Sequence, residues 1–351
     1  MSYITKPVAR HPGVRPNALG LTPRDYEGAM STLCAGCGHD SITAALVQTF
    51  YELDVEPHRV AKLSGIGCSS KTPTYFVSQA HGFNSVHGRM PSIAAGANAA
   101  NRDLLHVGIS GDGDSLSIGL GQMCHAIRRN VNMVYILENN GVYGLTKGQF
   151  SASADVGSVS KRGEVNRHGP IDPVDLALAL GATFVARSFS GDKRQLVPIL
   201  KAACRHHGLA FVDVISPCVT FNDHEGSTKS YAHTRAHAHE VIETDFVPLR
   251  AEITADYGTG AVHAVTMHDG SVVRFRKVHE DYDPTDRGAV LAHLREVRNR
   301  GEVATGLLYL EEAGEDLHEF ENTVDVPLVD VPYESLCPGS QALEEIQQEW
   351  R

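Results

Sequence analysis

Short apolar runs that alternate with helical patterns constrain the fold of this 351-residue chain more than any other feature. The runs are apolar on both faces, as strands buried on both sides of a sheet require. They span Val60–Ile66, Leu104–Ile109, Val131–Leu137, Thr183–Ala186 and Ala210–Ile215. This alternation is typical of repeated βαβ units and predicts an α/β fold with a doubly wound parallel sheet.

Changes in composition along the chain predict three segments. Residues 1–30 are rich in proline and lack periodicity, so we expect an extended N-terminal arm on the surface or on a partner. Residues 31–245 hold the predicted sheet, and their first helix is expected to start at Asp40 or Ser41. Residues 246–351 are expected to form an appendage, with a hairpin around the turn 268–270 and helices near 288–298 and 340–350.

Two polar motifs follow neighbouring strand runs, at the edge of a parallel sheet where ligands gather. Asp112 lies in a Gly-Asp-Gly-Asp motif after the second run, and Asn140 follows the third run 28 residues later (140 − 112 = 28). One βαβ unit takes about 30 residues, so both side chains are expected to meet and share a cation such as Mg²⁺. Gly111 and Gly113 permit a diphosphate to approach the backbone closely, and the helix after Asp114 directs its N-terminus at that anion. Either motif alone fits an ordinary turn, but the pair at this spacing indicates a diphosphate and metal site.

Four of the seven cysteines are expected to converge on one point. Cys34 and Cys37 form a CxxC pair, Cys68 follows the first strand run, and Cys218 follows the last. Four thiolates favour either Zn²⁺ or an iron-sulfur cluster, so structural zinc remains open from the cysteine pattern alone. The other three thiols are interpreted as core or surface residues: Cys124, Cys204 and Cys337.

Taken together, these motifs resemble a known enzyme family. The Gly-Asp-Gly and Asn-Asn spacing resembles the motif with which thiamine-diphosphate enzymes hold their Mg²⁺. With CAGCGH, GIGCSSK, HGR at 87–89 and SPC, residues 30–220 resemble the beta subunit of 2-oxoacid:ferredoxin oxidoreductases, in which the sheet is the diphosphate-binding (PP) domain. That family more often has Trp and Pro where this chain has Leu33 and Ala35, but neither is a ligand position.

The resemblance implies three cofactors: thiamine diphosphate, Mg²⁺ and one 4Fe-4S cluster. It assigns Asp112, Asn140 and the carbonyl of Val142 to Mg²⁺. It assigns to the cluster the four thiolates Cys34, Cys37, Cys68 and Cys218. The residues expected to contact the cofactor are His39, Gly67, Ser69, His87, Gly111, Gly113, Asp114 and Thr146.

The family's reaction couples oxidative decarboxylation of a 2-oxoacid to acylation of coenzyme A and reduction of ferredoxin; the motifs do not encode its direction. Thiamine enzymes need a second domain, for which this chain has no residues left. The resemblance therefore implies an alpha subunit that carries that domain and the coenzyme A site, with two αβ units in the assembly.

Substrate choice is expected to depend on the loop after the Asn-Asn pair. Leu145, Thr146 and Lys147 lie at the expected mouth of the pocket, and Lys147, Arg89 and Lys71 are candidate cations for a distal carboxylate. The sequence LTKGQ resembles the branch that acts on 2-oxoglutarate. Pyruvate or another 2-oxoacid remains the alternative, and a zinc-containing, non-redox thiamine-binding or regulatory subunit is the alternative of another class.

Composition excludes several classes of protein. The net charge of −11 disfavours nucleic acid and anionic membranes as partners.

No apolar stretch is long enough for a membrane helix and the start does not resemble a signal peptide, so we expect a cytoplasmic protein. His233, His237 and His239 are interpreted as a solvated or partner-facing helix, because only the first two are a helical turn apart.

Overall fold

The computed structural model describes residues 14–247, 262–266, 272–277, 282–311, 313–337 and 339–350. Its main element is a ten-stranded sheet. From one edge to the other the strands are β10 (Val262–Thr266), β11 (Val272–Lys277), β9 (Ala238–Val247), β12 (Val303–Leu310), β7 (Phe184–Phe189), β8 (Leu209–Ile215), β4 (Met133–Asn139), β3 (Leu105–Gly111), β1 (Val60–Ser64) and β2 (His81–Asn84).

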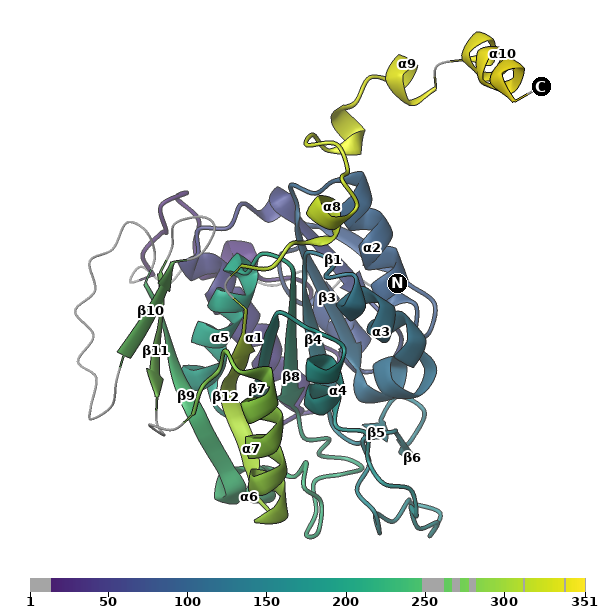
Figure 1. Cartoon of the computed structure of the whole chain (residues 1–351). Coiled ribbons are helices and arrows are strands. Elements are labelled where there is room, and N and C mark those ends of the chain that lie inside the picture. Colours follow the sequence, from purple (N-terminus) through teal and green to yellow (C-terminus); the bar gives the residue numbers. More distant parts are fainter. Residues whose placement is uncertain are drawn as a thin grey trace.

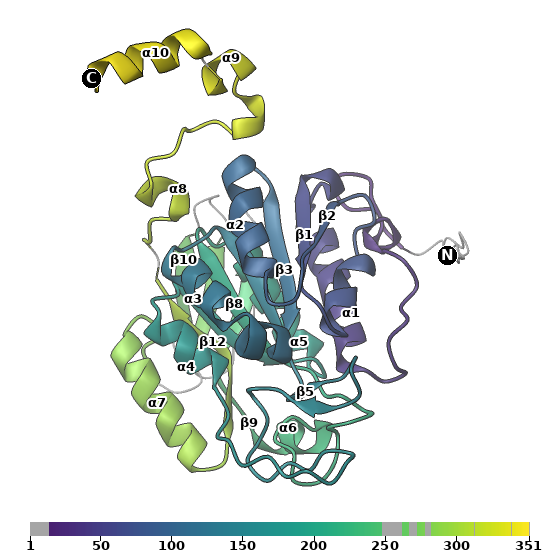
Figure 2. The ribbon, with the colours of Figure 1, turned by 90° about the vertical axis from the view of Figure 1, so that its right-hand side faces the viewer.

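The six strands from β7 to β2 pair in parallel, and their centre is buried on both faces. Helices cover both sides of this part (Figures 1 and 2). One layer holds α1 (Gly38–Glu52) and α5 (Lys193–Arg205); the other holds α2 (Met90–Ala100), α3 (Leu120–Arg128), α4 (Pro173–Ala179) and α7 (Arg287–Asn299). The predicted doubly wound α/β fold is confirmed, and each of the five predicted strand runs overlaps one of these parallel strands, whereas β2 was not predicted.

Two local predictions differ from the structure in detail. The first helix begins at Gly38 with Cys37 as its N-cap, so the predicted start at Asp40 or Ser41 was wrong. The Gly38 amide donates to the carbonyl of Pro217 (3.3 Å), which holds this helix start beside the Cys218 segment. The described part of the N-terminal segment packs on α1, where Asn17 Nδ2 donates to the carbonyl of Tyr51 (3.1 Å), and Tyr26 of this segment is buried.

The region after residue 245 extends the same sheet. The predicted boundary falls inside β9, and β12 lies between β9 and β7, antiparallel to β7 and parallel to β9. β10 and β11 form the predicted antiparallel pair, although the turn between them lies outside the described residues. The predicted helices correspond to α7 and α10 (Ser340–Glu349).

Short elements complete the chain. They include β5 (Val142–Tyr143), β6 (Gln149–Phe150), α6 (Tyr231–His237), α8 (Leu317–Phe320) and α9 (Tyr333–Leu336). The 3-10 helices are η1 (Pro23–Tyr26), η2 (Pro57–Arg59), η3 (Ser69–Thr74) and η5 (Leu328–Asp330), and the π-helical turn η4 (Gly113–Ile118) precedes α3. No helix in the described part of the chain is long and apolar enough to cross a membrane.

Candidate functional site

A cavity of about 80 Å³ opens where β1, β3 and β4 end. Its wall contains most residues that the sequence predicted for metal and cofactor binding, which come from five separate segments. The lining residues are His39, Ile66, Gly67, Cys68, Ser69, His87, Gly111, Asp112, Gly113, Asp114, Asn140, Val142, Tyr143, Gly144, Leu145 and Thr146. The parallel pairing of these strands explains the convergence, because their carboxyl ends share one sheet edge.

Asp112 is buried at the base of this cavity and its two oxygens have different surroundings. Oδ2 accepts hydrogen bonds from the Gly141 amide (2.9 Å) and from the hydroxyls of Ser153 (2.7 Å) and Ser151. Oδ1 has only a long contact with the Asn140 amide (3.4 Å). Oδ1 is therefore the oxygen left available for a cation.

Burial raises the pKa of Asp112, and the hydrogen bonds from Ser151 and Ser153 counteract that rise. The Asn140 carboxamide oxygen, which accepts from the Val142 amide (3.0 Å), adds a second oxygen of the kind that Mg²⁺ prefers. Asn222 fixes the same turn, since its Nδ2 donates to the Asn140 carbonyl (2.7 Å). The residues present fit a small divalent cation.

We expect the double substitution Ser151→Ala/Ser153→Ala to lower Mg²⁺ affinity by about 10- to 100-fold, as loss of groups that orient metal ligands commonly does. Both hydroxyls contact Oδ2, so their loss frees the carboxylate to turn. Calorimetric titration of Mg²⁺ in the presence of thiamine diphosphate measures the effect, with exposed Ser78→Ala as the matched control. Equal affinities for the two variants would contradict the orienting role.

A buried polar network supports Asp112 from the sheet side. Ser153 Oγ lies 2.8 Å from Asn139 Oδ1, and Asn139 Nδ2 donates to Asp213 (3.1 Å). Arg187 Nε donates to the other oxygen of Asp213 (2.7 Å). The network connects three strands, so the carboxylate is held by the sheet and not only by its own loop.

Asp114 organises the cavity wall. Its Oδ1 accepts from the Gly88 amide (2.7 Å) and the Ile66 amide (3.3 Å) and contacts His87 Nδ1. Its Oδ2 accepts from the Ser110 hydroxyl (2.6 Å). Protein donors therefore contact both oxygens, and Asp114 ties the HGR segment to the end of β1.

Glycines make room where these segments approach each other. A Cβ at position 113 would lie 2.6 Å from the Tyr143 ring, whose hydroxyl donates to the Gly113 carbonyl (2.9 Å). A Cβ at position 111 would lie 2.7 Å from Ser69 Oγ. Glycine at positions 111 and 113 therefore lets the Gly-Asp-Gly-Asp turn lie against Ser69 and Tyr143 in the cavity wall.

His39 is buried between the cavity and the cysteines. Its Nδ1 lies 2.7 Å from Ser216 Oγ and 3.1 Å from Glu138 Oε2, and its Nε2 lies 3.4 Å from Asn140 Nδ2. Burial lowers the pKa of His39 to about 4, so the imidazole is neutral at pH 7.

Burial also raises the pKa of Glu138 well above its ordinary value. Sequence reasoning missed Glu138, although a carboxylate that ends an apolar strand run was an available signal.

The four predicted cysteine ligands lie together beside this cavity. A Cβ at Gly144 would lie 3.4 Å from Cys68 Sγ and 3.7 Å from Cys218 Sγ, so both sulfurs border this glycine. Burial raises the pKa of Cys37 to about 12, and it also raises those of Cys68 and Cys218. The nearby Cys34 raises the pKa of Cys68 and of Cys218 further, and the Thr220 hydroxyl donates to the Cys34 sulfur (3.6 Å). Metal binding requires ionised thiolates, so these four thiols could hold a metal centre only if it offsets the cost of ionising them.

The three predicted cations lie away from the cavity wall. Arg89 is the exposed N-cap of α2, and Lys71 Nζ lies 3.5 Å from Thr32 Oγ1. Lys147 is exposed in the turn between β5 and β6, with a left-handed backbone (φ 81°). Of the turn between β5 and β6, Gly144, Leu145 and Thr146 line the cavity itself, whereas Lys147 does not.

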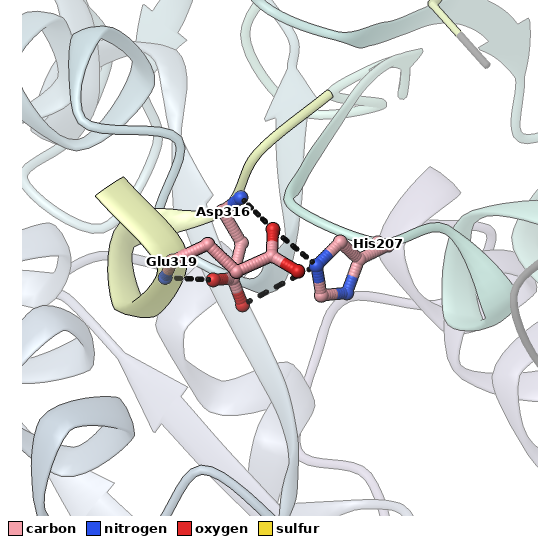
Figure 3. Close-up of side chains that lie close together, drawn as sticks. All are labelled: His207, Asp316 and Glu319. Carbon is pink, nitrogen blue, oxygen red and sulfur yellow. Dashed lines mark hydrogen bonds and ion pairs between the residues drawn. The ribbon is translucent and has the colours of Figure 1, made fainter. Parts of the chain in front are cut away.

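A second cluster of possible metal ligands, His207, Asp316 and Glu319, lies at the start of α8 (Figure 3). The two carboxylates form a capping box: Asp316 accepts from the first-turn amides, and Glu319 accepts from the Asp316 amide (2.9 Å). His207 Nε2 lies 3.0 Å from Glu319 Oε2. Helix capping and the His207–Glu319 hydrogen bond account for this cluster.

Comparisons with known proteins converge on one group of enzymes. Residues 65–214 match the family described as thiamine pyrophosphate enzyme, C-terminal TPP binding domain. The chain is 43% identical over 205 residues to the 2-oxoacid:ferredoxin oxidoreductase subunit beta of Saccharolobus solfataricus, covering 58% of this chain and 67% of that relative. It is 43% identical over 191 residues to the 2-oxoglutarate oxidoreductase subunit KorB of Mycobacterium tuberculosis, covering 54% of this chain. That alignment spans about half (51%) of the relative's own length.

A solved structure extends the likeness beyond the sheet. The chain superposes on 2-oxoglutarate:ferredoxin oxidoreductase from Magnetococcus marinus, solved with 2-oxoglutarate, coenzyme A and succinyl-CoA bound, with a TM-score of 0.71 and 30% identity. The superposition covers 88% of this chain and 91% of that chain.

Proposed function

Because this chain belongs to the beta subunits of the 2-oxoacid:ferredoxin oxidoreductases, we propose that it binds thiamine diphosphate through Mg²⁺ and carries one 4Fe-4S cluster. Together with a partner subunit it oxidises 2-oxoglutarate by two electrons, giving succinyl-CoA and CO₂ while ferredoxin is reduced. The same groups serve reductive carboxylation, the reverse reaction.

One observation carries this proposal. Cys68 lines the same cavity as Asp112 and Asn140, and the sulfurs of Cys68 and Cys218 both border Gly144, another residue of the cavity wall. The predicted cluster and the predicted diphosphate site therefore share a wall. A redox centre held by these cysteines would lie next to a cofactor held by Asp112 and Asn140 and could accept electrons from it.

The chain's own residues hold and orient the cofactor. Asp112 Oδ1, the Asn140 carboxamide oxygen and the Val142 carbonyl are the proposed Mg²⁺ ligands, and the cation holds the diphosphate. Thiamine diphosphate supplies the electron sink that decarboxylation of a 2-oxoacid needs. Neutral His39 lies between the two centres without adding charge to either.

An iron-sulfur cluster fits the cysteines better than one zinc ion. Zinc with bonds of about 2.3 Å to four thiolates needs sulfurs about 3.8 Å apart. Among the described residues, no three cysteine sulfurs lie within 4.8 Å of one another. The four sulfurs are therefore not packed as closely as one zinc ion requires.

A partner subunit must complete the site. The cavity of about 80 Å³ is far smaller than the roughly 300 Å³ or more of a typical ligand pocket. We propose that an alpha subunit covers this edge and supplies the second thiamine domain and the coenzyme A site. Ferredoxin is the proposed electron acceptor, as the names of the relatives suggest.

We propose 2-oxoglutarate as the substrate, with Lys147 as the cation for its distal carboxylate. Lys147 directly follows Thr146, which lines the cavity, and its side chain is exposed. The matched relatives and the solved neighbour that carry 2-oxoglutarate in their names support the same choice.

Replacing Lys147 with Gly or Gln should raise the KM for 2-oxoglutarate by about tenfold or more and leave the KM for pyruvate unchanged. The Gly variant also relaxes the backbone, so agreement between the two separates loss of charge from strain. Steady-state kinetics with both substrates measure the effect, with exposed Lys193→Gln as control. An equal rise in the KM for 2-oxoglutarate and for pyruvate would show that Lys147 does not recognise the distal carboxylate.

Anaerobic iron and sulfide analysis of the chain purified with its partner tests the function as a whole. We expect about four iron and four sulfide per chain, after subtraction of the partner's content, and a visible absorption band. Bleaching of that band on addition of 2-oxoglutarate and coenzyme A would support both the redox role and the substrate. Zinc without a visible chromophore would contradict electron transfer and leave only the thiamine site.

A further inference from the structure

The C-terminal arm, residues 320–350, exposes a large apolar surface. α9 and α10 stand clear of the body in both views (Figures 1 and 2). Ten large apolar side chains of the arm are more than a third exposed: Phe320, Val324, Val326, Leu328, Val329, Tyr333, Leu336, Leu343, Ile346 and Trp350. A contiguous stretch of exposed apolar side chains of this kind marks an interaction surface.

The arm is acidic as well as apolar. On α10 the side chains of Leu343, Ile346 and Trp350 recur at helical spacing and share one face, and Trp350 is 86% exposed. The sequence from 320 onward holds seven carboxylates against one base, the final residue Arg351. The surface that receives the arm must therefore be apolar with a basic rim.

A hairpin after β6, residues 156–167, has this complementary character. Its two strands are joined at Val159 and Val165, where the Ser160 amide donates to the Glu164 carbonyl (2.9 Å). Val156, Val159 and Val165 are 62%, 55% and 53% exposed. The hairpin has three basic residues, Lys161, Arg162 and Arg167, and one acidic residue, Glu164. All four are exposed.

The hairpin and the arm are far apart within one chain. In both views the loops around β5 and β6 lie at the opposite end of the molecule from α9 and α10. The arm of a chain therefore faces away from its own hairpin. A two-fold axis brings each arm to the hairpin of the other copy and makes the contact twice.

We propose that the C-terminal arm docks on the 156–167 hairpin of a second copy of this chain. The apolar face of α10 packs on the exposed valines, and Glu344, Glu345 and Glu349 face the bases of the hairpin. The contact gives a structural basis for the two αβ units that the family resemblance implies. It does not depend on the reaction proposed above, because it concerns assembly alone.

Charge reversal on each surface tests the contact in the complex purified with its partner subunit. The arm variant is Glu344→Lys/Glu345→Lys/Glu349→Lys, and the hairpin variant is Lys161→Glu/Arg162→Glu/Arg167→Glu. Native mass spectrometry and sedimentation velocity count the copies of this chain per complex. Each variant alone should weaken the association of two copies by at least about tenfold, and the variant carrying both sets should restore it.

The controls separate docking from misfolding. Lys193→Glu/Arg194→Glu reverses two exposed charges on α5 and should leave the copy number unchanged. Binding of Mg²⁺ and thiamine diphosphate to each variant reports whether the sheet is intact. The proposal is overturned if the wild-type complex holds one copy, if the single variants keep two copies, or if the combined variant fails to recover. Loss of the partner subunit from the arm variant would instead assign the arm to that subunit and would equally refute docking on a second copy.

Discussion

The substitution Asp112→Asn should reduce Mg²⁺ affinity by more than about a hundredfold and abolish turnover, since changes to groups behind a metal ligand already cost about 10- to 100-fold. The variant keeps the shape of the side chain and removes the charge that faces the cation. Its remaining oxygen can still accept from the Gly141 amide and from the two serine hydroxyls that now contact Oδ2. Titration of Mg²⁺ with thiamine diphosphate, followed by activity of the complex, measures both losses.

The same substitution should not destabilise the cofactor-free chain. Burial raises the pKa of Asp112 in the folded state, so ionisation of this group on folding costs free energy at neutral pH. That cost disappears as the pH falls through the folded pKa, and the neutral Asn never incurs it. The Tm of the cofactor-free variant at pH 7 is therefore expected to equal or exceed that of the wild type. A large fall in Tm would show that lost activity reflects misfolding and not a lost ligand.

The substitution Cys218→Ala should remove the cluster while thiamine diphosphate still binds. Iron is expected to fall well below about four atoms per chain, because removal of one of four thiolate ligands destabilises a 4Fe-4S cluster. Ferredoxin reduction should fall to background. Mg²⁺-dependent binding of thiamine diphosphate should persist, because Cys218 does not line the cofactor cavity.

The chain offers matched controls for this change. Cys124 lies on α3 and Cys204 on α5, both away from the four clustered thiols. Burial raises the pKa of Cys204 to about 12, as expected of an inert thiol. Alanine at either position should leave iron and ferredoxin reduction unchanged. Full iron content in the Cys218 variant would remove this residue from the ligand set.

Prediction from sequence succeeded for features that a short segment specifies by itself, such as a buried strand and the residues that follow it. Five of the six parallel strands were visible because each is a run of apolar residues, whereas the exposed edge strand β2 was not predicted. β3 and β4 place Asp112 and Asn140 at one edge by a general rule of parallel sheets. Cys68 and Cys218 follow strands of the same sheet, so the same rule brings them together.

The sequence was less informative about residues whose partners are distant along the chain. Ser151 and Ser153 contact Asp112 from a loop about 40 residues away, and neither belongs to a recognisable motif. Glu138 becomes important only because His39 packs against it from another helix. The position of Lys147 away from the cavity wall depends on the backbone of its turn, which a motif does not specify.

The sequence by itself therefore determined the sheet, the edge at which ligands gather and the residue types found there, because apolar periodicity and the rise of a strand are local properties. Tertiary structure decided which oxygen of Asp112 is free, which strands follow β7 at the sheet edge and where the C-terminal arm lies. These features depend on contacts between segments far apart in the chain, whose energies arise only when the chain has folded. β12 illustrates the difference: its apolar residues favour a strand, but only packing places it between β7 and β9.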